Sequence, residues 1–360
     1  MGWDVTVFDG AKEDLQDLDL LSGQKFDAII DFNSQMPKLD TTDDEYYLDT
    51  IDAPFYDYIL DHPMFHHDML KHELRNFHVI CIDEDHVDYI KEWYPHIRSV
   101  TMLPLPGTKA DEIIPFQKRS IPILFTGTYT DPHMILGLVQ NFGRHLKKEM
   151  TDLIEILTED PSKTMEAAFE ELIRSTGYDG ESLPDFFPTR MHAYFLVETY
   201  ITAYFRSKAV MNAAAAGIPM TIVGHNWEKC NPLQALSHVQ IKPPVDFDRT
   251  FGLMADSQIV FNVMPWFKNG CHDRIMSAAL NGAVPMSDRS GWFDGRATHG
   301  EDILLYSLEH TEDIPNILSR AFDDMPNLER IAENAQKKAV PHNWRNRCEK
   351  LAEIIALSES

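Results

Sequence analysis

Three polar side chains, His272, Asp273 and Arg274, stand immediately before the apolar stretch 275–280. That stretch is typical of a buried helix, so the three residues would form its first turn. The unpaired N–H groups and the dipole of a helix start favour a bound phosphate, and an arginine there adds charge and a planar pair of donors. The spacing therefore predicts a phosphate site, with the Arg274 guanidinium pointing to the loop. The plainer alternative is a helix cap with a surface ion pair.

The predicted helix lies between two apolar runs, residues 259–263 and 283–287, which have the length of buried strands. In open α/β sheets, ligands bind beyond the carboxyl ends of the strands. Asn262 and Asp288 stand at those ends and are therefore candidates for the same site. Further candidates follow two other predicted strands, with the tryptophan as a ring that would stack on a base: Gly127, Tyr129, Gly224, Asn226 and Trp227. Each of these residues also fits an ordinary turn or buried polar position.

Strands alternate with helices along the chain, which predicts parallel, doubly wound sheets. In the first part we expect strands at 3–8, 26–32, 78–82 and 100–105, and helices at 51–60 and 85–93. The pattern restarts after the charged pair Lys118-Arg119, with strands at 121–125, 220–223, 240–241, 257–263 and 283–287. Residues 133–210 are mostly helical, with a Gly/Pro-rich break at 177–188.

This pattern predicts an α/β protein with two Rossmann-like domains that face each other across a cleft. We expect the first domain at residues 1–115 and the second at 116–360. The second domain would carry a helical insertion at about 133–210 and a closing C-terminal helix that crosses back toward the first domain. The length of 360 residues is compatible with two domains.

A histidine-rich cluster, Asp61, His62 and His66, follows the predicted helix 51–60. Because histidine titrates near the working pH, a ring here is a candidate general base. A metal site is the weaker alternative, since His62 and His66 would share a helix face. Pro63 interrupts that helix, and no further carboxylate at ligand spacing completes a zinc set. We therefore expect a catalytic role for this cluster, and we expect no metal ion and no other cofactor. The alternative is that these are ordinary core or surface histidines.

The composition limits the classes of partner. The formal net charge is −25, which argues against nucleic acid or an anionic membrane as a ligand but leaves room for a local basic pocket. No apolar run approaches the ~20 residues of a membrane span, and the first residues do not resemble a signal peptide. The four cysteines are far apart and form no C-x-x-C pair. These features predict a cytoplasmic protein with reduced thiols.

The second half of the chain resembles the C-terminal domain of group 1 glycosyltransferases of the GT-B fold, particularly the spore-maturation-protein-like branch. The resemblance covers roughly residues 119–355 and rests on the helix start at 272–274, the Asn281-Gly282 turn, the Ser287-Asp288 strand end, and the segments 218–224, 245–247 and 342–347. It implies that the second domain binds a nucleoside-diphosphate sugar and the first binds a hydroxyl acceptor, which is a glycan, a small molecule or a protein. It thereby implies transfer of a hexosyl group without an obligatory metal.

Two features depart from this family. Many of its retaining enzymes carry two glutamates eight positions apart, whereas this chain has Asn269 and Ser277 at those places. That leaves His272, Asp273 and Asp288 as substitutes and leaves the stereochemistry open. Residues 2–8 resemble the second strand of the usual first unit, so either a first βα unit is missing or the chain begins late in the family's frame. Two alternatives remain: a nucleotide-sugar 2-epimerase and a non-catalytic sugar- or nucleotide-binding relative.

Overall fold

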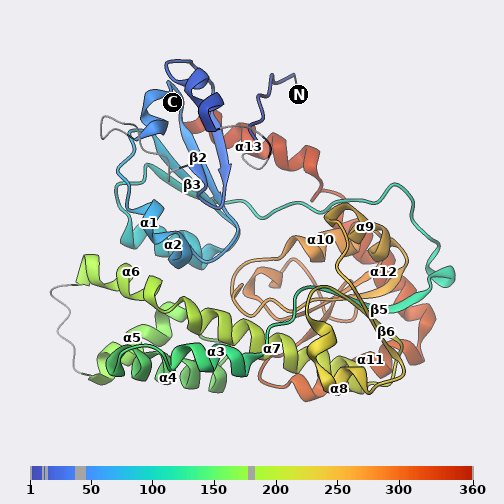
Figure 1. Ribbon diagram of the computed structural model, residues 1–360. Coiled ribbons are helices and arrows are strands. Elements are labelled where there is room, and N and C mark those ends of the chain that lie inside the picture. The colour runs from blue at the N-terminus through green and yellow to red at the C-terminus, as the bar shows by residue number, and fades with distance from the viewer. Residues whose placement is uncertain (1, 10–11, 13–14, 37–45, 177–182, 359–360) are drawn as a thin grey trace. The chain divides into compact units, whose positions relative to one another are not determined.

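The computed structural model describes residues 2–9, 12, 15–36, 46–176 and 183–358 (Figure 1). The chain divides into two compact units. Unit 1 comprises residues 1–103, 187–192 and 345–360, and unit 2 comprises residues 104–186 and 193–344. This division differs from a single cut at 115/116, because residues 104–115 join unit 2 while the last helix and a short piece of the helical insertion join unit 1.

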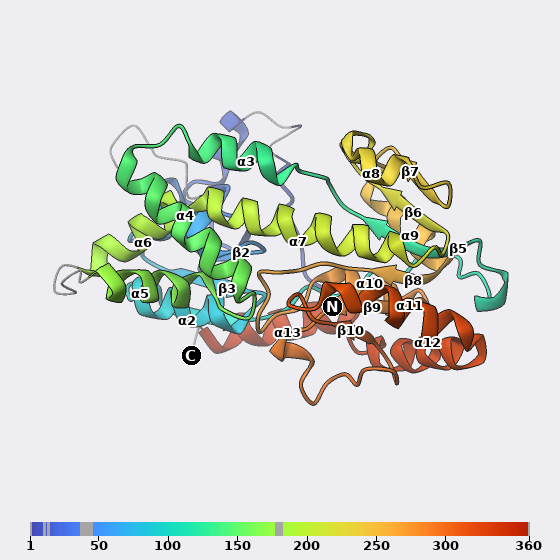
Figure 2. The same ribbon diagram turned by 90° about the horizontal axis from the view of Figure 1, so that it is seen from below.

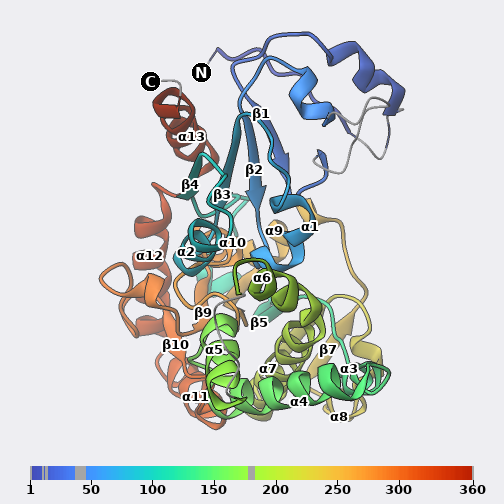
Figure 3. The same ribbon diagram turned by 90° about the vertical axis from the view of Figure 1, so that its left-hand side faces the viewer.

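Unit 1 is built on a parallel sheet in which the strands follow their sequence order (Figure 3). Its strands are β1 (Ile29–Phe32), β2 (Phe55–Ile59), β3 (Phe77–Cys81) and β4 (Ser99–Met102). Its helices include the 3-10 helix η4 (Pro63–His66), α1 (His67–Leu70), α2 (Glu84–Trp93) and most of α13 (Trp344–Ser358). The expected strands at 26–32, 78–82 and 100–105 and the helix at 85–93 are thus present within a few residues.

Two expectations for unit 1 are wrong. Residues 3–8 form no strand, and Val5 and Val7 are 67% and 74% exposed. The segment 51–60 contains strand β2 instead of a helix. All five residues of β2 are buried, and all except Asp57 are apolar or aromatic. Burial on both faces removes the alternation of apolar and polar residues that marks a strand, so the aromatic sequence is also compatible with a helix.

Unit 2 contains a six-stranded parallel sheet in the order β10-β9-β8-β5-β6-β7. The strands are β5 (Ile121–Thr126), β6 (Met220–Val223), β7 (Val239–Lys242), β8 (Ser257–Phe261), β9 (Val284–Asp288) and β10 (Leu304–Tyr306). The sequence analysis did not predict β10, a strand of three residues. The chain runs outward from β5 in one direction and from β8 in the other, so the topological switch point lies between β5 and β8.

Helices cover this sheet and form the predicted insertion between β5 and β6. The insertion comprises α3 (Pro132–Val139), α4 (Arg144–Glu159), α5 (Met165–Thr176), α6 (Leu183–Ala193) and α7 (Phe195–Ala215). Figure 2 shows α3 and α4 alongside the long helix α7. The expected break at 177–188 falls partly on residues 177–182, which lie outside the described residues, and its remainder belongs to α6.

The other helices of unit 2 are α8 (Asn231–Gln234), α9 (Phe247–Ala255), α10 (Asp273–Leu280), α11 (Ile314–Asp323) and α12 (Met325–Ala339). Among the described residues, no helix combines the length and the apolar character needed to cross a membrane. Helix α10 follows β8 and returns to β9, which places its N-terminus at the carboxyl edge of the sheet.

Candidate active site

Arg274 connects the two strands that flank the switch point. Its Nε donates to the Thr126 hydroxyl at 3.0 Å, at the end of β5, and its Nη1 donates to the Asn262 side-chain oxygen, just beyond β8. The expectation that this guanidinium points only to the loop is therefore wrong, because it also ties two strand ends together. Burial lowers the pKa of Arg274 to about 10, so the group remains positive at neutral pH.

A second arginine, Arg206 of α7, lies near Arg274. Its Nη1 donates to the Thr128 carbonyl oxygen at 3.1 Å, in the loop after β5. Burial lowers the pKa of Arg206, and its charge in turn lowers the pKa of both Arg274 and His272. We refer to Arg206, His272 and Arg274 as the switch-point cluster. Sequence reasoning missed Arg206, because it stands within a long helix and belongs to no local motif.

His272 begins α10 and contacts two neighbours through one ring nitrogen. Its Nδ1 lies 2.6 Å from an Asp273 carboxylate oxygen and 3.1 Å from the Arg274 backbone nitrogen. Nδ1 accepts the Arg274 N–H as the N-cap of α10, and the Asp273 carboxylate lies against the same nitrogen. Burial, together with the two arginines, lowers the pKa of His272, so the ring is neutral at pH 7.

The loops after β5 and β6 pack closely against each other. A Cβ atom on Gly224 would lie 1.9 Å from the Gly127 carbonyl oxygen, so only glycine fits there. Trp227 donates its Nε1–H to that same oxygen at 2.7 Å. Asn226 adopts a left-handed conformation with φ of 65° and donates to the Tyr129 carbonyl oxygen at 3.4 Å. The predicted residues of these two loops therefore lie together, and they contact mainly one another.

The expectation that Trp227 stacks on a base is wrong, because its side chain is completely buried. Its ring packs edge-on against Phe125 at 5.5 Å and lies 5.1 Å from the Tyr129 ring. Tyr129 is partly exposed and presents the aromatic surface at this edge. Tryptophan contributes a large apolar area at any buried position, so its residue type alone did not distinguish core from ligand contact.

Asn262 and Asp288 lie beneath the site. Asn262 is fully buried, and its side-chain amide donates to the Ser287 hydroxyl at 3.0 Å. Asp288 is 1% exposed and accepts the Met264 N–H at 2.8 Å. Burial raises the pKa of this carboxyl group to about 6. Both side chains therefore position the groups around them, and Asn262 connects Arg274 to β9.

Ser277, which replaces a glutamate of the resembled family, is buried in α10 and faces another part of the chain. Its hydroxyl accepts the Thr108 N–H at 3.0 Å. A Cβ atom at Gly107 would lie 2.5 Å from the Met276 carbonyl carbon, so the segment that follows β4 runs directly along α10. This close packing leaves Ser277 no path to a ligand at the carboxyl edge.

In unit 1, the structure separates the roles of the three predicted residues. His62 caps η4 by accepting the Met64 N–H at Nδ1, and its ring lies edge-on to His86 at 4.8 Å. His66 contacts the Ser34 hydroxyl at 2.9 Å through Nδ1, and its Nε2 is also buried. Asp61 is exposed and accepts a hydrogen bond from the Asn33 amide at 2.9 Å.

Sequence reasoning also missed the network that holds this edge of unit 1. The Ser34 hydroxyl donates to Asp57 at 2.5 Å, so His66 must donate to Ser34 from its Nδ1. Asn33 and Ser34 both adopt left-handed conformations, with φ of 56° and 55°. Such strained positions are held by their surroundings, here by the Ser34 N–H bond to Asp57 at 2.9 Å and the Leu60 N–H bond to Asn33 at 2.8 Å.

The described residues contain no group of three or more His, Cys, Asp or Glu side chains that could hold a metal ion. The switch point of unit 2 carries cations, and the edge of unit 1 carries the exposed carboxylate of Asp61.

The switch-point cluster lies inside a segment with a recognisable sequence pattern. Residues 206–353 match the family model described as glycosyl transferase-like. This segment begins at Arg206 and contains His272 and Arg274, so all three residues of the cluster belong to it. No curated protein matches the chain in a sequence search.

Solved structures of glycosyltransferases resemble the whole fold. TarM of S. aureus matches with a TM-score of 0.50 and 8% identity over 91% of this chain, which spans only 54% of TarM. Sucrose-phosphate synthase from Thermosynechococcus elongatus matches with a TM-score of 0.49 and 10% identity. This match covers 85% of this chain and 68% of the synthase. Anabaena HepE, solved in complex with UDP-glucose, matches with a TM-score of 0.47 and 14% identity, and the match covers 84% of this chain and 72% of HepE. The fold is the GT-B type, with two parallel α/β units.

Proposed function

We propose that this protein transfers a hexosyl group from a nucleoside-diphosphate sugar to a hydroxyl group of an acceptor, without an obligatory metal ion. The observation that carries the proposal is the convergence of Arg206 and Arg274 at the switch point of unit 2, beside the N-terminus of α10. The two guanidinium groups are half-buried and lie close enough for the charge of Arg206 to lower the pKa of Arg274, while one carboxylate acts on each of them, Glu198 on Arg206 and Asp273 on Arg274. A diphosphate would add the negative charge that both arginines attract.

The same groups would assist the reaction. When the bond between the sugar C1 and the diphosphate oxygen breaks, negative charge develops on the leaving diphosphate. Fixed donors already aimed at that position stabilise the charge without reorganisation, and one such donor is typically worth about a hundredfold or more in rate. Arg206, Arg274 and the dipole at the N-terminus of α10 are suited to this role, and Tyr129 offers its ring to the nucleobase.

Asp61 is the group that we assign to the acceptor. It is an exposed carboxylate at the carboxyl edge of the unit 1 sheet, and Asn33 fixes its position. In the proposed reaction it takes the proton of the acceptor hydroxyl as the new bond to C1 forms. His62 and His66 hold the surrounding loops, because their Nδ1 atoms are occupied by contacts within the protein.

The test is a thermal-shift measurement with a panel of nucleoside diphosphates and their hexose conjugates, in the presence of EDTA. A ligand that binds only the native state raises the melting temperature with its concentration. We expect a shift for at least one nucleotide, a loss of that shift in Arg206→Met, and no change in the matched control Arg320→Met, an exposed arginine of α11. A shift that requires added divalent cation contradicts the metal-independent mechanism, and no shift with any nucleotide contradicts the donor class.

A further inference from the structure

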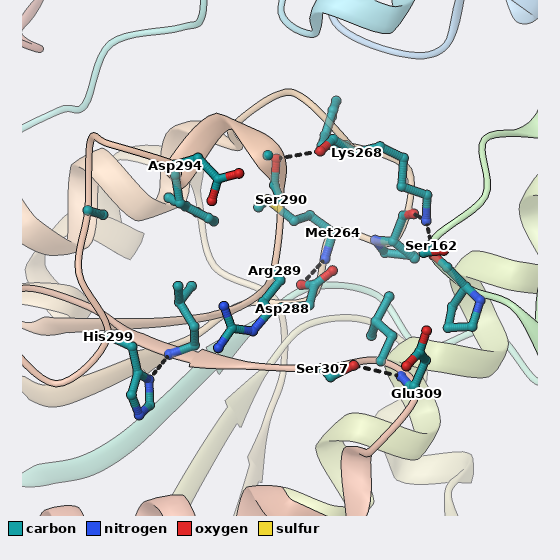
Figure 4. Close-up of a pocket in the computed structure, with 18 of the residues that line it drawn as sticks. Ser162, Met264, Lys268, Asp288, Arg289, Ser290, Asp294, His299, Ser307 and Glu309 are labelled. Atoms are coloured by element: carbon teal, nitrogen blue, oxygen red, sulfur yellow. Dashed lines mark hydrogen bonds between the residues drawn. The ribbon is translucent and has the colours of Figure 1, made fainter.

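A second ligand site lies beside the switch-point cluster in unit 2. A cavity of about 580 Å³ opens beyond the carboxyl ends of β8, β9 and β10 (Figure 4). The loop after β8 supplies one wall through Met264 and Lys268, and the loop after β9 supplies another through residues 289–299. The volume is within the range of small-molecule sites, about 300–1,000 Å³. Neither the arginines of the cluster nor any predicted site residue except Asp288 lines it.

Some polar groups of the pocket are already engaged by the protein. The Lys268 ammonium donates to the carbonyl oxygens of Pro161 and Pro265, and thereby joins the loop to the helical insertion. The Ser290 hydroxyl donates to the Gly270 carbonyl oxygen at 2.7 Å. His299 accepts the Leu305 N–H at Nδ1, 2.9 Å away, so its neutral ring carries a proton on Nε2. These groups fix the walls.

Three charged side chains at the pocket remain available. Asp294, Glu309 and Arg289 are exposed, and through their side chains they form no hydrogen bond or ion pair with the described residues. Figure 4 shows them reaching the pocket from different sides. A ligand that bonds to all three must offer both donors and acceptors.

The balance of charge selects the chemical class of that ligand. Three carboxyl groups line the pocket, whereas its cations are Arg289 and the already engaged Lys268. Burial and the charge of Arg289 lower the pKa of His299, so the ring adds no positive charge at pH 7. A phosphate or carboxylate would meet net repulsion here. Hydroxyl groups, in contrast, donate to Asp294 and Glu309 and accept from Arg289, and apolar residues such as Phe293 and Leu305 suit the C–H face of a sugar ring.

We propose that this pocket binds a neutral saccharide unit, with Asp294 and Glu309 as its hydroxyl acceptors. The inference rests in part on the proposed function, because a chain of hydrogen bonds joins the pocket to the diphosphate site. Asp288 of the pocket contacts Ser287 at 3.4 Å, Ser287 accepts from Asn262 at 3.0 Å, and Asn262 accepts from Arg274. The saccharide is either the sugar of the donor or a separate one, and the two sources share the same chemistry.

The experiment uses the full chain with the double variant Asp294→Asn/Glu309→Gln. Both side chains are exposed and have no partner to lose, so the fold should be retained. The matched control is Asp248→Asn/Glu301→Gln, which removes two exposed carboxylates outside the pocket. Calorimetry measures the affinity for a nucleoside diphosphate and for its hexose conjugate, and saturation-transfer NMR measures the binding of free hexoses and disaccharides.

We expect the double variant to bind the nucleoside diphosphate as the wild type does, and to lose at least about tenfold in affinity for a saccharide, because two bonds to charged groups are removed. If only the affinity for the hexose conjugate falls, the pocket binds the sugar of the donor. If the affinity for free saccharide falls, the pocket binds a saccharide that is separate from the donor. Saccharide affinities equal in wild type, variant and control overturn the proposal. If no nucleotide binds at all, the proposed function fails, while binding of free saccharide still decides the pocket.

Discussion

The carboxyl edges of the two sheets use polar residues in opposite ways. In unit 2, Thr126, Asn262 and Arg274 come from three separate elements and meet at the switch point. In unit 1, residues that are neighbours in sequence, His62 and His66, are separated by their contacts: one caps a helix and the other holds Ser34. A cluster in the sequence is therefore weaker support for a site than residues that only the topology brings together.

Electrostatics separates the two edges further. In unit 2, burial lowers the pKa values of the two arginines, and the carboxylates Glu198 and Asp273 raise the pKa of Arg206 and of Arg274, respectively. At the corresponding edge of unit 1, burial lowers the pKa of His67, so this ring stays neutral, and its Nδ1 contacts the Tyr94 hydroxyl. The predictions below test this contrast between a charged edge built for a ligand and an edge whose histidines are structural.

The largest effect is expected for Asp61→Asn. A general base contributes about 10²–10⁴-fold, so transfer to the acceptor should fall by at least a hundredfold, while the thermal shift with nucleotide is retained. The comparison variant is His62→Asn, which removes the imidazole but keeps a good cap for η4; it should retain most of the transfer rate. If His62→Asn abolishes transfer and Asp61→Asn does not, the histidines of unit 1 are catalytic after all.

Arg274→Ala should lower turnover by about a hundredfold, because one fixed donor to the leaving diphosphate is lost. The variant should also lose about 1–2 kcal/mol in the free energy of unfolding, since Thr126 and Asn262 each lose a partner. Initial rates and urea denaturation measure the two effects separately, with Arg320→Ala as the control. A rate close to that of the wild type would remove Arg274 from the diphosphate site.

Asp288→Asn tests whether the edge of unit 2 costs stability. The folded pKa of about 6 lies above the ordinary 3.8, so between these values the folded state holds more protons and loses stability as the pH rises. The loss by pH 7 is about 2–3 kcal/mol. Asparagine does not titrate, so the stability of the variant relative to the wild type should increase from pH 4 to pH 7 in urea denaturation. A difference in stability between variant and wild type that stays constant with pH would place Asp288 outside a desolvated environment.

The smallest effect concerns the pH dependence of nucleotide affinity. Burial and the two arginines lower the pKa of His272 in the free protein, and a bound diphosphate would raise it again. Binding then takes up a proton, so affinity should increase severalfold as the pH falls from 7.5 to 6. The nucleotide itself titrates near pH 6, so the informative quantity is the difference between the wild type and His272→Gln, measured by calorimetry. Parallel pH profiles would show that the ring faces no phosphate.

Most of the parallel strands of both sheets could be predicted, because each is a short apolar run with turn residues at its ends. Strands β5, β6, β8 and β9 lie within a few residues of their predicted positions. The missed strand β10 has only three residues, too few to show a period. The sequence of β2 favours a helix because both faces of the strand are buried and no alternation marks it. Residues 3–7 are exposed and form no strand, so a β-rich composition alone does not create one.

The sequence by itself determined the helix start at residues 272–274, because caps and first-turn charges are local properties of the chain. It also indicated the glycosyltransferase resemblance of the second half, now supported by the match over residues 206–353. Only the tertiary structure decided that Arg206 joins this helix start, that Trp227 is core, and that Ser277 faces Thr108. The order of strands sets which loops meet at the switch point, and that order arises from packing between segments far apart in the sequence.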